Sequence, residues 1–153
     1  MKSAPDAHDP DWPKYPETIL IFATNPPVEI DLRATPSQNA LSELSAAGLG
    51  KPFAIMTAFD PRGENLSPEE NRRRARSLED RLGSAGYSFV AVDCCSPDRS
   101  HCECSVAVVM PQETAIEIAR ELEQIAIFWF DGQRFWIVGA ALATDPLMLP
   151  RSS

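Results

Sequence analysis

The chain has no long hydrophobic run, and this absence limits the cellular compartments in which it is expected. No apolar segment approaches the roughly 20 residues that a membrane helix needs, so no membrane partner is expected. Residues 1–13 contain no apolar core of a secretory signal either. The sequence therefore predicts a cytoplasmic protein.

Basic residues and cysteines are also scarce. The chain has 14 Lys+Arg against 22 Asp+Glu, a formal net charge of -8. Because nucleic-acid binding needs a basic face, no nucleic-acid partner is expected of this acidic chain. Four cysteines in 153 residues do not make a disulfide scaffold, and in the cytoplasm we expect them to be reduced.

What remains is the composition of an ordinary globular protein, with 44% apolar residues in 153. A chain of this size forms one domain and buries roughly 70% of its unfolded surface. Prolines crowd the first residues, so we expect a flexible N-terminal arm over 1–15. A single α+β domain over 16–143 and an extended C-terminal tail over 144–153 complete the expected organisation.

Local patterns predict the elements of that domain. Ser67-Pro68-Glu69-Glu70 is a capping box, which predicts a helix over 68–82. Alternating apolar runs predict strands, and Asp131-Gly132 predicts a tight turn between two of them. The expected strands are 18–22, 28–32, 53–59, 87–92, 103–110, 125–130 and 134–138; the other expected helices are 37–47 and 112–123, and 93–100 is expected to be a loop.

From residue 53 the element order is β-α-β-β-α-β-β. Its first six elements follow the ferredoxin-like, split βαβ pattern. The predicted fold class is therefore α+β: a ferredoxin-like core with an antiparallel sheet and two helices on one face. An N-terminal β-hairpin and a short helix precede this core.

Two motifs carry a family resemblance: T-A-F-D-P at 57–61 and L-S-P-E-E-N at 66–71. With H-C-E at 101–103 and Q-I-A-I at 124–127, the chain resembles a bacterial family called domain of unknown function 3293. The resemblance covers roughly residues 15–139. It departs at Phe59 and Asp60, where the family usually has Trp and Asn, and it implies no particular activity.

The predicted topology brings several polar residues toward one edge of the sheet. Strands 53–59 and 103–110 are expected to be antiparallel neighbours, so the end of the first lies beside the start of the second. Such convergence is what a ligand site needs, although every strand end also carries polar turn residues. The residues expected at this edge are Thr57, Asp60, Asn71, Asp93, His101, Glu103 and Gln124.

Asn71 and Arg74 share a helix face with core residues, so we expect them to lean toward the sheet. The simpler interpretation is structural: Asn71 ties the preceding loop, and Arg74 pairs with Asp60 or Glu103. The functional interpretation makes them ligand-binding residues together with Thr57, Asp60, Glu103 and Gln124.

His101 and Glu103 lie two residues apart, on one face of a strand. The pair can be a base and its orienting group, two metal ligands, or a strand-end salt bridge. His8 falls in the expected arm, so His101 is the only credible imidazole catalyst. His101 and Glu103 are accordingly the catalytic candidates.

All four cysteines fall within eleven residues: Cys94, Cys95, Cys102 and Cys104. With His101 they offer soft ligands, but their spacing matches no standard zinc motif. A cross-strand disulfide between Cys95 and Cys102 is geometrically possible, and burial as small hydrophobic residues is the simplest interpretation. No metal and no cofactor are therefore expected.

The sequence favours a binding or interaction module for a small molecule or a partner protein, acting as a monomer or homodimer. The aromatic residues of the last hairpin are a candidate protein contact. The alternative is a small hydrolase-like enzyme in which His101 and Glu103 act as acid and base while Asn71 and Arg74 position an anionic substrate. Because no nucleophile motif or phosphate loop is present, the non-enzymatic interpretation leads.

Overall fold

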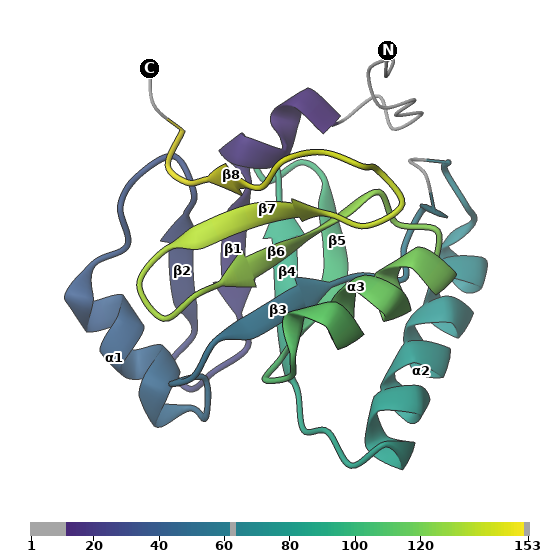
Figure 1. The fold of residues 1–153 in the computed structure, drawn as a ribbon, viewed down its shortest axis with the longest axis horizontal. Helices are drawn as coiled ribbons and strands as arrows, with labels where there is room; N and C mark the ends of the chain where they lie inside the picture. Colours follow the sequence, from purple (N-terminus) through teal and green to yellow (C-terminus); the bar gives the residue numbers. More distant parts are fainter. Residues whose placement is uncertain (1–11, 62–63, 152–153) are drawn as a thin grey trace.

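The computed structural model describes residues 12–61 and 64–151. Over that range the protein is a mixed α+β structure built on one antiparallel sheet (Figure 1). The predicted α+β class and antiparallel sheet are confirmed. The elements are η1 (a 3-10 helix, Trp12–Glu17), β1 (Ile19–Phe22), β2 (Val28–Asp31), α1 (Gln38–Ala46), β3 (Phe53–Met56), α2 (Pro68–Ser84), β4 (Val90–Cys95), β5 (Cys102–Val108), α3 (Gln112–Glu121), β6 (Ala126–Phe130), β7 (Phe135–Gly139) and β8 (Leu147–Met148).

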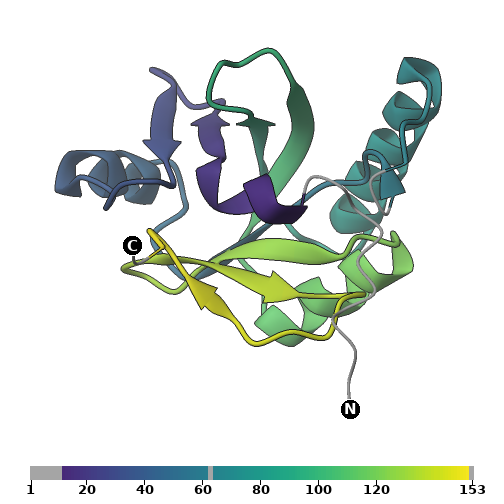
Figure 2. The ribbon, with the colours of Figure 1, turned by 90° about the horizontal axis from the view of Figure 1, so that it is seen from above.

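The sheet has eight strands in the order β2-β1-β4-β5-β3-β6-β7-β8. It is larger than the core expected from the sequence, because the first hairpin joins one edge through the β1–β4 pair and β7 and β8 extend the other. Seen from above, this sheet curls into a half-barrel (Figure 2).

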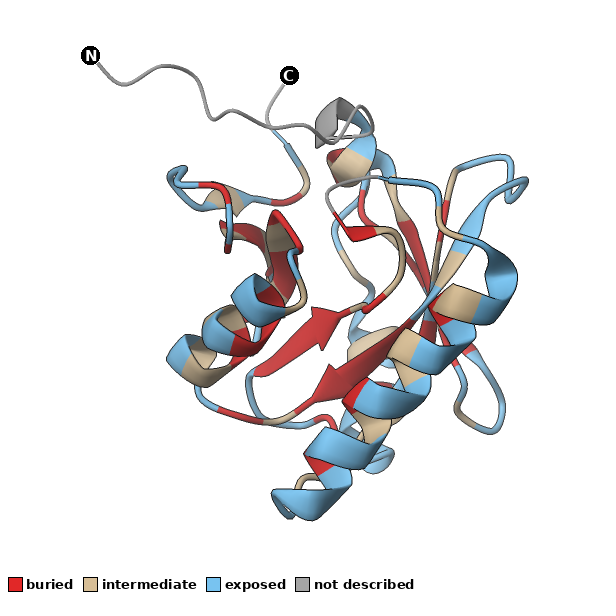
Figure 3. Ribbon diagram, turned by 90° about the vertical axis from the view of Figure 1, so that its right-hand side faces the viewer, coloured by how far each residue is buried: buried red, intermediate tan, exposed pale blue. Residues whose placement is uncertain are grey.

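Two hydrophobic cores lie on the two faces of the sheet. The inner face of the curl is rich in aromatic side chains and includes Phe53 and Phe135, with Leu44 of α1. The other core joins Leu78 of α2 and Ile118 of α3 to the sheet. Strand β3 is buried along its whole length because it faces both cores, whereas the outer side of α2 is exposed (Figure 3).

The Ser67 N-cap forms as predicted. The Ser67 side chain accepts a hydrogen bond from the Glu70 amide at 3.1 Å, and α2 starts at Pro68. Such a cap contributes about 1 kcal/mol to stability. The helix continues to Ser84, two residues beyond the expected end.

Strands β3 and β4 end at different residues from those expected. Strand β3 stops at Met56 because the Thr57 hydroxyl takes over: it donates to the Cys104 carbonyl at 2.8 Å and accepts from the Phe59 amide at 3.0 Å. Strand β4 runs on to Cys95, so residues 93–95, expected in a loop, belong to the sheet.

Both ends of the described chain contact the sheet. Residues 1–11 of the expected arm lie outside the described residues, and η1 follows them. Tyr15 of η1 packs on Phe128, with ring centroids 6.1 Å apart. In the expected tail, β8 pairs with β7, and Leu149 is buried. None of the helices described is long and apolar enough to cross a membrane.

Candidate functional site

A pocket of about 620 Å³ opens at the ends of the central strands, on the inner face of the curled sheet. One wall comes from η1 and another from the loop between β4 and β5. The floor comes from β3 and the starts of β5 and β6, including Ile55, Ala126 and Phe128. The strand ends therefore do converge, and they enclose a cavity of the size that small molecules occupy.

Asp60 and Asn71 form the best-fixed polar contact beside this pocket. The Asn71 oxygen accepts from the Asp60 amide at 3.0 Å, and the Asn71 Nδ2 donates to the Asp60 Oδ1 at 3.0 Å. The Leu66 amide also donates to that Oδ1 at 3.0 Å. Asn71 is only 6% exposed. These bonds hold Asp60 in a left-handed backbone conformation with φ 44° and fix its carboxylate.

Arg74 and Gln124 bind the main chain next to Asp60. Arg74 donates from Nε to the Ala58 carbonyl at 2.6 Å and from Nη2 to the Leu122 carbonyl at 2.7 Å. The expectation that Arg74 pairs with a carboxylate is therefore wrong, because its hydrogen bonds go to main-chain carbonyls. Gln124, also buried, donates to the Phe59 carbonyl at 2.8 Å. Both side chains therefore brace the bend after β3.

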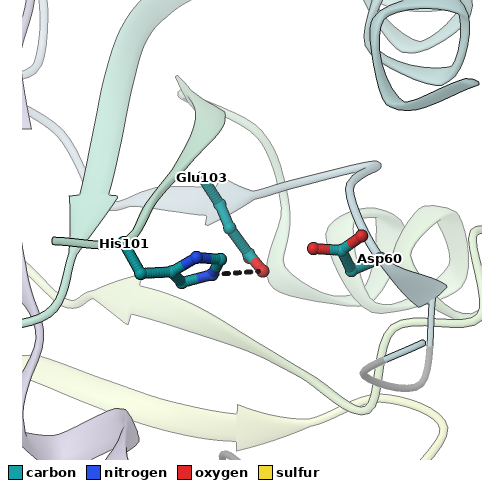
Figure 4. Close-up of side chains that lie close together, drawn as sticks. All are labelled: Asp60, His101 and Glu103. Carbon is teal, nitrogen blue, oxygen red and sulfur yellow. Dashed lines mark ion pairs between the residues drawn. The ribbon is translucent and has the colours of Figure 1, made fainter. Parts of the chain in front are cut away.

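Three polar side chains meet at the mouth of the pocket: Asp60, His101 and Glu103 (Figure 4). The His101 Nε2 lies 3.6 Å from the Glu103 Oε2, and their side chains are 58% and 28% exposed. One ligand atom from each of the three residues lies within 4.8 Å of the others. The structure thus brings Asp60 to both catalytic candidates.

Asp93 does not join this group. It pairs with Cys104 in the β4–β5 ladder, whereas Glu103 pairs with Cys94. Because successive side chains of a strand point to opposite faces, Asp93 lies on the face opposite to Glu103. The expectation that Asp93 joins the polar group is therefore wrong, because the register of the β4–β5 pair places it on the other face.

The loop that carries His101 is braced from within and from outside. The Asp98 Oδ1 accepts from the Ser96 hydroxyl at 2.8 Å and from the Ser100 amide at 3.0 Å and hydroxyl at 2.7 Å. The bonds from Ser100, followed by that from Ser96, lower the pKa of Asp98 to about 2. Arg99 makes a two-bond pair with Glu29 of β2, at 2.9 and 2.6 Å. The position of His101 is therefore set by several contacts.

The cysteines divide into a disulfide and two thiols. Cys95 and Cys102, directly opposite in the ladder, are joined by a disulfide that closes the base of this loop. The preferred expectation of four reduced cysteines is wrong for this pair, because β4 extends far enough to place Cys95 beside Cys102. Burial raises the pKa of the Cys94 thiol to about 12, while Cys104 is exposed.

Opening this disulfide is expected to lower the free energy of unfolding by about 2–3 kcal/mol, the loop-entropy value for a ring this small. The two cysteines are separated by 7 positions. Urea unfolding of the Cys95→Ala, Cys102→Ala double variant measures the loss. Cys104→Ser, which removes an exposed thiol, is the control. Equal stability of the double variant and the wild type would show that the bond does not hold the loop.

One wall of the pocket was missed from the sequence. Lys14, Tyr15 and Glu17 of η1 line the cavity, although the sequence predicts a flexible arm up to residue 15. The available signal was Tyr15, a large aromatic residue placed only four positions before β1. The prolines before and after Tyr15 favour a flexible arm when the sequence is considered alone.

The fold and the site together define a small α+β domain with a ligand-sized pocket inside a curled antiparallel sheet. Residues 56–127 match the model of the family described as "Protein of unknown function (DUF3293)". The family resemblance seen in the sequence motifs is thereby confirmed. The match includes the Asp60–Asn71 contact, His101, Glu103 and Gln124. Comparison with curated proteins gives no match, and comparison with solved structures gives none either.

Proposed function

We propose that the protein is a binding module for a small molecule with an apolar body and a positively charged or hydrogen-bond-donating end. The observation that carries this proposal is the pocket itself. Its floor is apolar, and Asp60, His101 and Glu103 stand together at its mouth.

The size and lining of the pocket support a small molecule. Ligand pockets commonly enclose about 300–1,000 Å³ and combine an apolar lining with a few placed polar groups. The volume here is about 620 Å³, with Ile55, Ala126 and Phe128 in the floor. A partner protein at the last hairpin has less support, because Phe130 and Phe135 are buried and Trp129 and Trp136 are half-buried against the second core.

The charge of the site indicates the polar end of the ligand. Two of the three groups at the mouth are carboxylates, one of them fixed in orientation by Asn71. The two carboxylates offer acceptor oxygens and negative charge, which suit an ammonium or N–H group of a ligand. The formal net charge of -8 also favours the approach of cations.

We interpret the scaffold of this pocket as a ferredoxin-like core. Strands β4, β5, β3 and β6 are consecutive neighbours and pair antiparallel. Along the chain they are linked as β3-α2-β4-β5-α3-β6, which is the split βαβ order. In this interpretation β1 and β2 at one edge and β7 and β8 at the other are additions to the core, and Glu29 of β2 binds Arg99 in the loop of His101.

The hydrolase-like alternative draws on one observation, the 3.6 Å approach of His101 to Glu103. The same alternative also requires Asn71 and Arg74 to bind an anionic substrate. Both residues instead make hydrogen bonds to the protein, Asn71 with Asp60 and Arg74 with two carbonyls. Binding is therefore the proposed function.

Phenethylamine is a suitable probe because it joins an aromatic body to an ammonium group. We expect it to shift the amide NMR signals of residues 57–60, 101–105 and 126–128 in a saturable way, with EDTA present throughout. Phenylacetate, with the opposite charge, should leave these signals in place. Glu103→Gln should weaken phenethylamine binding about tenfold, which corresponds to about 1.4 kcal/mol.

Glu43→Gln is the matched control, since it removes the same charge from an exposed position of α1. It should bind the amine as the wild type does. Equal losses in the two variants, unshifted pocket signals with phenethylamine, or equal binding of phenylacetate would contradict the proposal.

A further inference from the structure

Three metal-ligating side chains meet at the pocket mouth from two separate parts of the chain. Asp60 follows β3, while His101 and Glu103 lie at the start of β5. Figure 4 shows the two carboxylates and the imidazole directed toward a common space. We infer that this group binds one divalent cation of the first transition row, such as Zn²⁺, with Asp60 as a third ligand beside the His101–Glu103 pair.

The separations suit a single ion. With bonds of about 2.1 Å, two ligand atoms on a tetrahedral zinc ion lie about 3.4 Å apart. The His101 Nε2 and Glu103 Oε2 are already 3.6 Å apart. The widest of the three separations is at most 4.8 Å, so it would have to close by up to about 1.4 Å for all three atoms to bind one ion.

Asp60 is held from behind by hydrogen bonds, as metal ligands commonly are. The Asp60 Oδ1 accepts from both the Leu66 amide and the Asn71 Nδ2, so the carboxylate has one orientation. The Cys95–Cys102 disulfide closes the loop next to His101. Binding an ion therefore requires little reorganisation of the chain.

The donor set selects the type of cation. An imidazole with two carboxylates suits a first-row divalent ion better than Mg²⁺, which retains waters and favours oxygen ligands alone. Three protein ligands also leave coordination positions open toward the pocket.

The cysteines are poorly placed to bind the ion in place of these three residues. Cys95 and Cys102 are joined in the disulfide, and the half-buried Cys94 is not among the residues whose ligand atoms meet within 4.8 Å. Cys104 pairs with Asp93 on the opposite face of the sheet. The inference rests on the same site as the proposed function, and the ion and an ammonium group would compete for the same carboxylates; it requires no organic ligand.

Calorimetric titration of the EDTA-treated, dialysed full chain with ZnCl₂ tests it, with no organic molecule present. We expect one equivalent to bind, and Glu103→Gln and His101→Ala each to weaken binding at least about tenfold. His8→Ala, which removes the other histidine of the chain, and Glu43→Gln should bind zinc as the wild type does. Circular dichroism shows whether each variant is folded.

Cobalt(II) gives a second readout that identifies the ligand type. Binding without a near-ultraviolet thiolate-to-cobalt band is expected, since the ligands are oxygen and nitrogen atoms. A strong thiolate band, zinc binding that survives His101→Ala and Glu103→Gln, or no saturable zinc binding would overturn the inference. Because the phenethylamine titration is made in EDTA, it fails or succeeds independently of this result.

Discussion

Replacing Arg74 with alanine is expected to lower the free energy of unfolding by about 3 kcal/mol. The guanidinium joins the Ala58 carbonyl, after β3, to the Leu122 carbonyl, after α3. Hydrogen bonds to charged groups contribute about 1.5–3 kcal/mol each, and Ala58 is 1% exposed, so water cannot easily replace Arg74 there. Urea unfolding followed by circular dichroism measures the loss.

Arg76→Ala is the matched control, because Arg76 is exposed on the same helix. It should change stability by no more than about 0.5 kcal/mol. Arg74→Lys should recover less than half of the loss, since an ammonium group lacks the planar fork that reaches two carbonyls. Similar unfolding curves for Arg74→Ala and Arg76→Ala would show that Arg74 does not brace the site.

Replacing Asn71 with alanine is expected to cost a similar amount, about 3 kcal/mol. The substitution leaves the Asp60 amide without its acceptor and removes one of the donors to the Asp60 Oδ1. A buried group left without a partner costs about 1–3 kcal/mol, and the lost bond adds to that cost. The measurement is again urea unfolding, paired with the phenethylamine titration, which should weaken because Asp60 is no longer fixed.

Asn39→Ala on α1 controls for the loss of a carboxamide, since Asn39 is exposed. Asn71→Asp should be worse than Asn71→Ala at neutral pH, because it places a second carboxylate against that of Asp60. If Asn71→Asp is as stable as the wild type, the Asp60–Asn71 contact is not the anchor of the pocket.

The local elements were predictable because their signals are local. The capping box at Ser67 and the Asp131-Gly132 turn each specify a few neighbouring residues, and both act as expected. The meeting of Asp60 with Glu103 was also predictable, since antiparallel pairing alone puts the end of β3 beside the start of β5.

The features that the sequence did not predict depend on strand register and on contacts between residues that lie far apart in the chain. Asp93 falls on the wrong face because one more residue in the pairing decides which side chains point inward. The partners of Arg74 are main-chain carbonyls, which every residue offers, so no side-chain pattern reveals them. The first hairpin joins the sheet through the pairing of β1 with β4, which are separated by 67 residues in the chain, and η1 leads directly into β1 and lines the pocket.

The central claim is that the pocket beside Asp60, His101 and Glu103 is a binding site, and a high-resolution crystal structure of the full chain soaked with phenethylamine tests it most directly. The predicted result is an aromatic ring against Phe128 with its ammonium group hydrogen-bonded to the carboxylate of Glu103 or Asp60. An empty pocket with the amine bound elsewhere, or a Glu103 side chain turned away from Asp60, would contradict it.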